Sequence, residues 1–253
     1  MNPRYCDLLP IPNLLETRSI LFVQPHPDDL EIGAGATMAH LAKSGCHITC
    51  LTITNGSVGT YEHNINPEDL AKTRRFEAEK GVTKIGIKNM VWLDFPDGGN
   101  LPYEEVRAEV TRVIRELKPS AVLTCDPWLP YEIHSDHIRS GMAAAEAAFL
   151  APMPHFCPED LLEGLQPHMV EIIGFYYTAY PNTFIDVAKT WELKLSAIDC
   201  HKSQFVQNDA GKFKAYLTAK ARELGKEHGC KMIESLKVLS PQHLHIFEDA
   251  WRC

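Results

Sequence analysis

The first 150 residues alternate between short apolar runs with the length of buried strands and segments whose apolar side chains have helical spacing. Parallel strands need long crossover connections, which are usually helices. This order therefore predicts an α/β fold, a three-layer, Rossmann-like arrangement in which helices cover both faces of a mostly parallel sheet. The strand candidates are residues 19–25, 47–53, 90–93 and 121–123, and the helix candidates are residues 35–44, 67–80, 103–117 and 136–149.

The pattern changes after about residue 150. Residues 151–167 favour a loop or a short helical turn. Further on, Gly225 is a stop signal for the last helix candidate, residues 212–224. No repeat, low-complexity tract or clean linker divides the 253 residues, so we expect a single domain over residues 1–253. The later strand candidates are residues 170–176 and 184–187, and the later helix candidates are residues 191–200 and 212–224.

The composition excludes several classes of protein. A net charge of −8 argues against a nucleic-acid surface, which needs a basic stripe. No apolar run is long enough to span a membrane, and residues 1–7 lack the pattern of a signal peptide. The eight cysteines form no CxxC pair, so we expect mostly reduced thiols in a cytoplasmic protein.

The segment from Gln24 to Gly33 is the first of two polar motifs at strand ends. It contains one imidazole and three carboxylates and follows a run that reads as a buried strand. Polar groups just beyond the carboxyl ends of parallel strands line a crevice. A His and an Asp three residues apart, with Pro27 stiffening the turn, form half of a metal site. The alternative is a surface turn, in which Pro and Asp are common. The four polar residues are His26, Asp28, Asp29 and Glu31.

The second motif is His134-Ser135-Asp136-His137, at the expected start of the helix after the strand at 121–123. His134 and His137 can share one helix face, while Asp136 points elsewhere. This suits one histidine on a metal, one facing substrate, and a carboxylate that orients an imidazole. The alternative is a simple helix cap. Because both motifs follow strands of one parallel sheet, they should face one crevice, which predicts a zinc or similar metal hydrolase.

On these two motifs the sequence resembles the LmbE-like (PIG-L) family of zinc-dependent N-deacetylases, over about residues 19–204 as the domain core. The family carries His-Pro-Asp-Asp after its first strand, then a small-residue segment that opens a helix, and later His-x-Asp-His. Two departures are Leu30, where many members have an acidic residue, and Ala36 in place of a second glycine. Weaker similarities are Thr54-Asn55-Gly56, Arg74 with Glu77, Pro96-Asp97-Gly98 and Ser203-Gln204.

The resemblance implies a role for each matching residue. Zn²⁺ is the expected metal, with Fe²⁺ as another divalent candidate, and it would make a nucleophilic hydroxide available at neutral pH. Arg74 is a candidate contact to a substrate hydroxyl or phosphate, although a solvated helix face is its alternative. The implied metal ligands are His26, Asp29 and His137. The implied general base is Asp28, and His134 would stabilise the oxyanion and protonate the leaving amine. Asp136 would hold His134 in its tautomer and raise its basicity.

The same resemblance implies that the protein removes an acetyl group from a small N-acetylated sugar of the N-acetylglucosaminyl type. It also favours a homo-oligomer. The loops at 57–66, 94–102 and 151–168 are expected to select the sugar. For each aromatic side chain that could stack on a sugar, the alternative interpretation is a structural position in the core or in a loop. These side chains are Tyr61, Trp128, Tyr131, Tyr176 and Tyr177.

Three other functions compete with this one. A metal-dependent hydrolase of another amide or of a phosphoester could use the same ligands, but phosphoester chemistry usually adds a second metal or cationic clamps. A nucleotide-binding oxidoreductase needs Gly-x-Gly-x-x-Gly after the first strand, whereas this chain has carboxylates there and Met38 at the third glycine position. A non-catalytic Rossmann-like binding module would not need Asp28 and His134.

Overall fold

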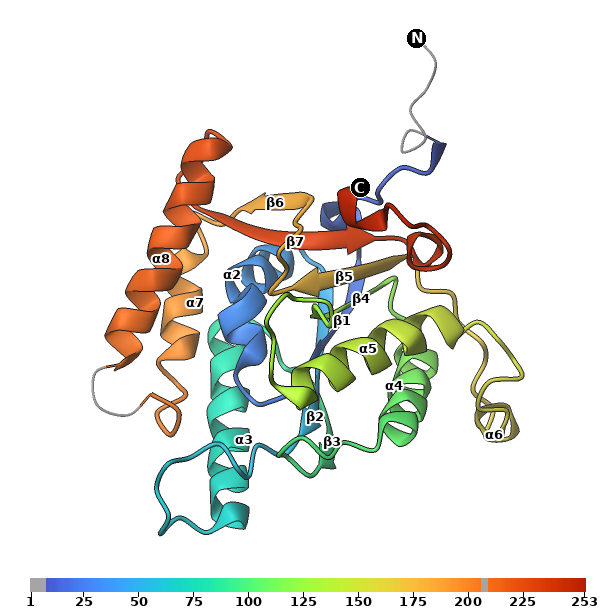
Figure 1. Ribbon diagram of the computed structural model, residues 1–253, viewed down its shortest axis with the longest axis horizontal. Helices are drawn as coiled ribbons and strands as arrows, with labels where there is room; N and C mark the ends of the chain where they lie inside the picture. The colour runs from blue at the N-terminus through green and yellow to red at the C-terminus, as the bar shows by residue number, and fades with distance from the viewer. Residues whose placement is uncertain (1–7, 206–208) are drawn as a thin grey trace.

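A seven-stranded sheet in the order β3-β2-β1-β4-β5-β7-β6 forms the centre of the computed structural model, which describes residues 8–205 and 209–253 (Figure 1). The signal-peptide expectation falls on residues 1–7, outside the described residues. The strands are β1 (Ser19–Gln24), β2 (His47–Thr54), β3 (Asn89–Phe95), β4 (Ala121–Cys125), β5 (Ile172–Tyr176), β6 (Thr183–Asp186) and β7 (Ile233–Leu239). The helices are α2 (Asp29–Lys43), α3 (Pro67–Lys84), α4 (Tyr103–Leu117), α5 (Ser135–Leu150), α6 (Glu159–Leu162), α7 (Trp191–Ile198) and α8 (Asp209–Glu227), with short 3-10 turns η1 (Leu14–Glu16), η2 (Pro241–Leu244) and η3 (Ala250–Arg252).

The five strands from β1 to β5 are parallel, which confirms the predicted sheet. The chain runs outward from β1 to β3 and then returns to the other side of β1 as β4 and β5, so the strand order reverses between β1 and β4. Ligands bind in the crevice outside such a switch point.

The antiparallel strand β7 lies between β5 and β6 and was not expected from the sequence. Its charged residues Glu234 and Lys237 obscure the strand pattern. Both side chains are buried: Glu234 forms an ion pair with Lys194, and the ammonium of Lys237 donates to the carbonyls of Trp251 and Cys253.

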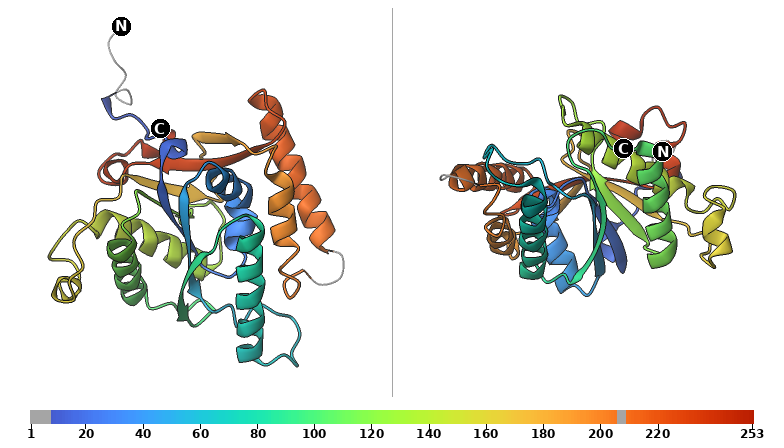
Figure 2. Two further views of the ribbon diagram at one scale, coloured as in Figure 1. Left: turned by 180° about the vertical axis from the view of Figure 1, so that it is seen from behind. Right: turned by 90° about the horizontal axis from the view of Figure 1, so that it is seen from below.

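Helices cover both faces of the sheet, as predicted. Helices α2, α3, α7 and α8 lie on one face and α4 and α5 on the other (Figure 2). Alternate residues of β1 point to opposite faces. Ile20 and Phe22 join the core under α2, whereas Leu21 and Val23 join the core under α4 and α5.

Among the helix ends that differ from the predicted ones, two involve closely packed glycines. Helix α2 begins at Asp29, six residues before the predicted start, because Gly33 and Gly35 are used for close packing rather than as helix breakers. A Cβ atom at Gly33 would lie 2.4 Å from the ring of Tyr176. Helix α8 continues through Gly225, where a Cβ atom would lie 2.8 Å from the carbonyl oxygen of Cys230. In both cases tertiary packing overrides local propensity.

No helix in the described ranges has the length and apolar character needed to cross a membrane. The cysteines with free thiols include Cys46, Cys50, Cys125, Cys157, Cys200 and Cys230.

Candidate active site

The two polar motifs meet at the carboxyl edge of the sheet. His26 follows β1, Asp28 and Asp29 lie at the start of α2, and His134 and His137 lie at the start of α5. They line one cleft of about 310 Å³, together with Arg74 from α3. The other lining residues are Ile32, Val58, Gly59, Asp97, Gly98 and Gln204.

His26, Asp29 and His137 form a compact group of metal-ligand type. The Nδ1 atom of His26 lies 3.3 Å from Oδ2 of Asp29, and Nε2 of His137 lies 3.4 Å from Oδ1 of the same carboxylate. Tetrahedral zinc, with bonds of about 2.0–2.2 Å, holds neighbouring ligand atoms about 3.3 Å apart. Two imidazoles and one carboxylate are a donor set of catalytic zinc sites. The residues therefore fit a divalent metal ion.

The charges around this group also favour a cation. Burial alone would raise the pKa of Asp29, but His137 and His26 lower it below its usual range, so the carboxylate is ionised as a ligand must be. Burial disfavours the charged form of His26, yet hydrogen bonds to Asp136, Asp29 and Asp97 raise its pKa well above 6.5. Without a metal, the surplus of carboxylates recruits a proton to this imidazole.

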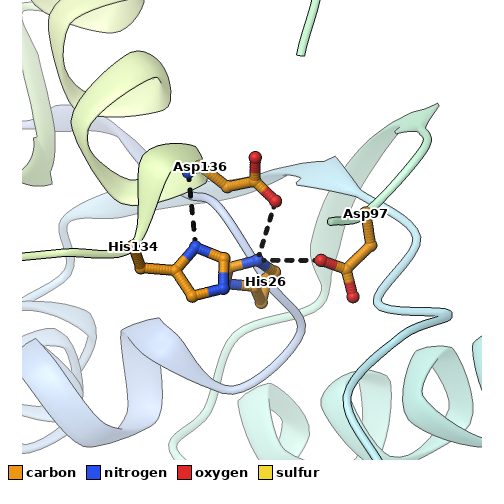
Figure 3. A group of neighbouring side chains, drawn as sticks. All are labelled: His26, Asp97, His134 and Asp136. Carbon is orange, nitrogen blue, oxygen red and sulfur yellow. Dashed lines mark hydrogen bonds and ion pairs between the residues drawn. The ribbon is translucent and has the colours of Figure 1, made fainter. Parts of the chain in front are cut away.

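Asp97 and Asp136 contact the other nitrogen of His26 (Figure 3). Nε2 lies 3.2 Å from Oδ1 of Asp97 and 3.4 Å from Oδ2 of Asp136. A histidine that binds metal through one nitrogen usually donates its other N–H to such a carboxylate. With His134, these three residues also form a second group with the spacing of metal ligands. The motif Pro96-Asp97-Gly98 predicted no role for Asp97. The place of Asp97 after β3, at the same sheet edge, was the signal that could have indicated one.

The expected contact between the Asp136 carboxylate and His134 is wrong. The carboxylate faces His26 and accepts a hydrogen bond from the Gly98 amide at 3.1 Å, while Nδ1 of His134 accepts one from the Asp136 backbone amide at 3.3 Å. The cause is helix geometry, since Asp136 points away from the face that His134 and His137 share. The charge of Asp136 does raise the pKa of His134, as expected, but burial and then the charges of His26 and His137 outweigh it, so the pKa of His134 is lowered overall.

The buried Arg74 pairs with the partly buried Asp28 beside the metal ligands. Nη2 of Arg74 donates to Oδ1 of Asp28 at 3.3 Å, and Nη1 donates to the carbonyl of Gly56 at 3.1 Å. Arg74 is 3% exposed, so the alternative of a solvated helix face is wrong. Burial raises the pKa of Asp28 to about 6 even though Arg74 lowers it.

Glu31 lies apart from the metal-ligand group. Its carboxylate is fully buried and lies 3.2 Å from Nε2 of His201, a histidine for which no sequence motif predicted a role. The loops around 57–66 and 94–102 contribute to the cleft, but residues 151–168 contribute none of its lining within the described ranges. That segment packs on α4, where the buried guanidinium of Arg115 binds Asp160 and the Met153 carbonyl.

The five aromatic candidates for sugar stacking lie outside the cleft lining. Tyr176 is fully buried, and Tyr61 and Tyr131 are fully exposed. Trp128 packs edge-on against Phe175 at a centroid distance of 5.5 Å. Tyr177 lies 6.2 Å from the ring of His137, in a nearly parallel stack.

A metal-ligand group beside a partly buried carboxylate, at the switch point of a parallel sheet, defines an α/β metal-dependent hydrolase. A family model described as PIG-L: GlcNAc-PI de-N-acetylase matches residues 21–148. Diacetylchitobiose deacetylase from Thermococcus kodakarensis is 39% identical over 232 residues, which cover 91% of this chain and 86% of that protein. The chain belongs to the PIG-L (LmbE-like) family of N-deacetylases, as its sequence motifs predicted.

Solved structures agree with this assignment. N,N'-diacetylchitobiose deacetylase from Pyrococcus horikoshii superposes with a TM-score of 0.88 at 36% identity, covering 92% of this chain and 89% of that one. The hydratase GalB from a Pseudomonas strain has a TM-score of 0.73 at 19% identity, covering 87% and 95%. The fold is therefore compatible with different reactions, and the family assignment rests on sequence and site.

Proposed function

We propose that this protein hydrolyses the acetamide of a small N-acetylglucosaminyl sugar, releasing acetate and a free amine. The observation that carries the proposal is the convergence of His26, Asp29 and His137 in one cleft with Asp28 and His134. The relatives named above, which are described as diacetylchitobiose deacetylases, support diacetylchitobiose as the first substrate to test.

We assign the metal to His26, Asp29 and His137, and we propose Zn²⁺ because this donor set is that of catalytic zinc sites. The second group, around Asp97 and Asp136, is better explained as a hydrogen-bonding partner of Nε2 on His26, which leaves Nδ1 for the metal. When bound, a divalent metal polarises the acetamide carbonyl and lowers the pKa of a water molecule.

Asp28 is the proposed general base. A base works best when its pKa lies near the working pH. With a pKa of about 6, Asp28 is mostly ionised at neutral pH and still basic enough to accept a proton from the attacking water. The hydrogen bond from Arg74 fixes the position of this carboxylate, so Arg74, which also lines the cleft, is proposed to orient Asp28 as well as to contact substrate.

His134 is the proposed donor to the developing oxyanion. Its Nδ1 atom accepts the hydrogen bond from Asp136, so the proton of the neutral ring lies on Nε2. A lowered pKa keeps the ring neutral at pH 7, and a neutral ring can donate a hydrogen bond but cannot readily release its proton. We therefore assign proton delivery to the leaving amine to Asp28, which holds the proton taken from water, rather than to His134.

Metal analysis and a substrate panel test this proposal. The purified protein should contain about one divalent ion per chain and release acetate from N,N'-diacetylchitobiose. A chelator should abolish this release, and Zn²⁺ or Fe²⁺ added back singly identifies the productive metal. Absence of a bound divalent metal, or faster hydrolysis of a phosphomonoester than of any N-acetylated sugar in the panel, contradicts the proposal.

A further inference from the structure

Glu132, two residues before the His134-x-Asp136-His137 motif, faces the metal ligand His137. We propose that Glu132 is a positioning residue that holds His137 in the tautomer with its proton on Nδ1, leaving Nε2 free for the metal. This inference rests on the metal site proposed above.

The imidazole of His137 lies between two carboxylates. Its Nδ1 atom is 3.2 Å from Oε2 of Glu132, and its Nε2 atom is 3.4 Å from Oδ1 of Asp29. Nδ1 is buried, and no described residue makes an aligned hydrogen bond to it, so Glu132 is the carboxylate placed to accept its proton.

The turn before α5 fixes Glu132 in this place. Its other carboxylate oxygen, Oε1, accepts a hydrogen bond from the backbone amide of His134 at 2.7 Å. Its own amide donates to the carbonyl of Leu129 at 3.1 Å. Tyr177 stacks on the His137 ring, and its hydroxyl donates to the Asp29 carbonyl at 3.1 Å. The ring is therefore constrained at its edge and on a face.

The same arrangement occurs at His26, whose Nδ1 faces Asp29 while Nε2 faces Asp97 and Asp136. Each histidine of the proposed metal site thus has a carboxylate at the nitrogen that is turned away from Asp29. Such partners fix the tautomer and raise the basicity of a ligand, and their loss typically weakens metal binding by about 10–100-fold.

Glu132→Gln separates the two roles of the side chain. The amide oxygen of Gln still accepts from the His134 backbone, whereas the charge opposite Nδ1 is lost. We expect the zinc dissociation constant of the metal-free protein to rise about 10-fold in Glu132→Gln and about 100-fold in Glu132→Ala. Competition with a chromophoric zinc chelator measures both, and nitrogen-15 NMR of labelled histidine reports the His137 tautomer. The matched control is Glu171→Gln, at an exposed position.

The possible outcomes are distinct. If wild-type protein does not bind zinc, the proposed metal site fails. If wild type binds zinc and Glu132→Gln binds it within twofold with an unchanged His137 tautomer, the role of Glu132 is overturned. Weaker binding in Glu132→Gln with an unchanged thermal midpoint supports it. If Glu132→Ala does not fold, the Gln variant decides.

Discussion

Asp28 and Asp29 are adjacent in the chain, yet their surroundings move their pKa values in opposite directions. Burial raises the pKa of Asp28 to about 6, whereas the imidazoles of His137 and His26 outweigh burial and lower that of Asp29. Titratable neighbours whose pKa values are pushed apart usually have different catalytic roles. This contrast supports the proposed roles of Asp28 as base and Asp29 as ligand.

Replacing Asp28 by Asn should therefore remove the base and leave the metal site in place. We expect kcat for acetate release to fall by about 10²–10⁴-fold, the usual contribution of a general base. Elemental analysis of the same preparation should still find the wild-type amount of metal. Retention of more than a tenth of wild-type kcat would contradict the role, and a lowered metal content would show that Asp28 is itself a ligand.

Helix α5 lies unusually close to β4, and this contact places two histidines of the site. A Cβ atom at Gly141 would be 2.5 Å from the carbonyl oxygen of Cys125, a backbone atom that cannot move independently. The Cys125 thiol donates to the carbonyl of His137 at 3.2 Å. The first turn of α5 is thereby fixed relative to the strand end.

We expect Gly141→Ala to push α5 away from β4. The overpacking should lower the free energy of unfolding by about 1–3 kcal/mol. Because His134 and His137 move with the helix, kcat/KM should fall as well. Urea unfolding and steady-state kinetics measure the two effects. In the control Gly211→Ala, in α8, the new Cβ meets open space, so stability should stay constant or rise by up to about 1 kcal/mol. Equal behaviour of the two variants would refute the proposed contact.

His201, which follows α7, connects three helices through a buried pair. Nε2 of His201 lies 3.2 Å from Glu31 of α2. A Cβ atom at Gly81 of α3 would lie only 2.4 Å from the Glu31 carboxylate and 3.1 Å from Nε2 of His201. Burial alone would lower the pKa of His201, but the charge of Glu31 and its contact raise it above 6.5.

A raised pKa in the folded state means that folding favours the protonated imidazole. The stabilisation from His201 should be fully present below about pH 6.5, the value in the unfolded chain, and should be lost as pH rises through the higher folded value. We expect the difference in unfolding free energy between wild type and His201→Gln to be larger at pH 6 than at pH 9. Both proteins share the titrating groups away from this contact, so the difference reports His201 together with its contact to Glu31. A difference that grows with pH would show the opposite linkage.

At the scale of the whole molecule, the sequence predicted what depends on local pattern and missed what depends on distant partners. The alternation of strand and helix predicted the parallel part of the sheet, including α4 at its observed bounds. Strand β7 was missed because Glu234 and Lys237 look exposed until Lys194 and the chain end are brought beside them. The single-domain boundary at 1–253 stays a prediction.

The candidate site divides in the same way. The meeting of the two motifs was predictable because strand ends of one parallel sheet share an edge. The choice of His26, Asp29 and His137 as ligands came from the family resemblance and stays a proposal. The roles of Asp97 and Glu132 could not be read from the sequence, since each depends on the direction in which a carboxylate points across the cleft. For Asp136, helix geometry already indicated a direction away from His134, whereas its contact with His26 across the cleft could not be read from the sequence.

Removing the metal should abolish activity without unfolding the protein. The two buried cores lie on the faces of the sheet, whereas the proposed ligands lie at its edge, and His26 can take up a proton when the cation leaves. We expect a chelator-treated sample to keep its far-ultraviolet circular dichroism and lose acetate release, which returns when Zn²⁺ is restored. At a free metal concentration of 100 times the dissociation constant, the free energy of unfolding should rise by about 2.7 kcal/mol, which urea unfolding measures. Loss of secondary structure on chelation would instead make the metal a structural element of this fold.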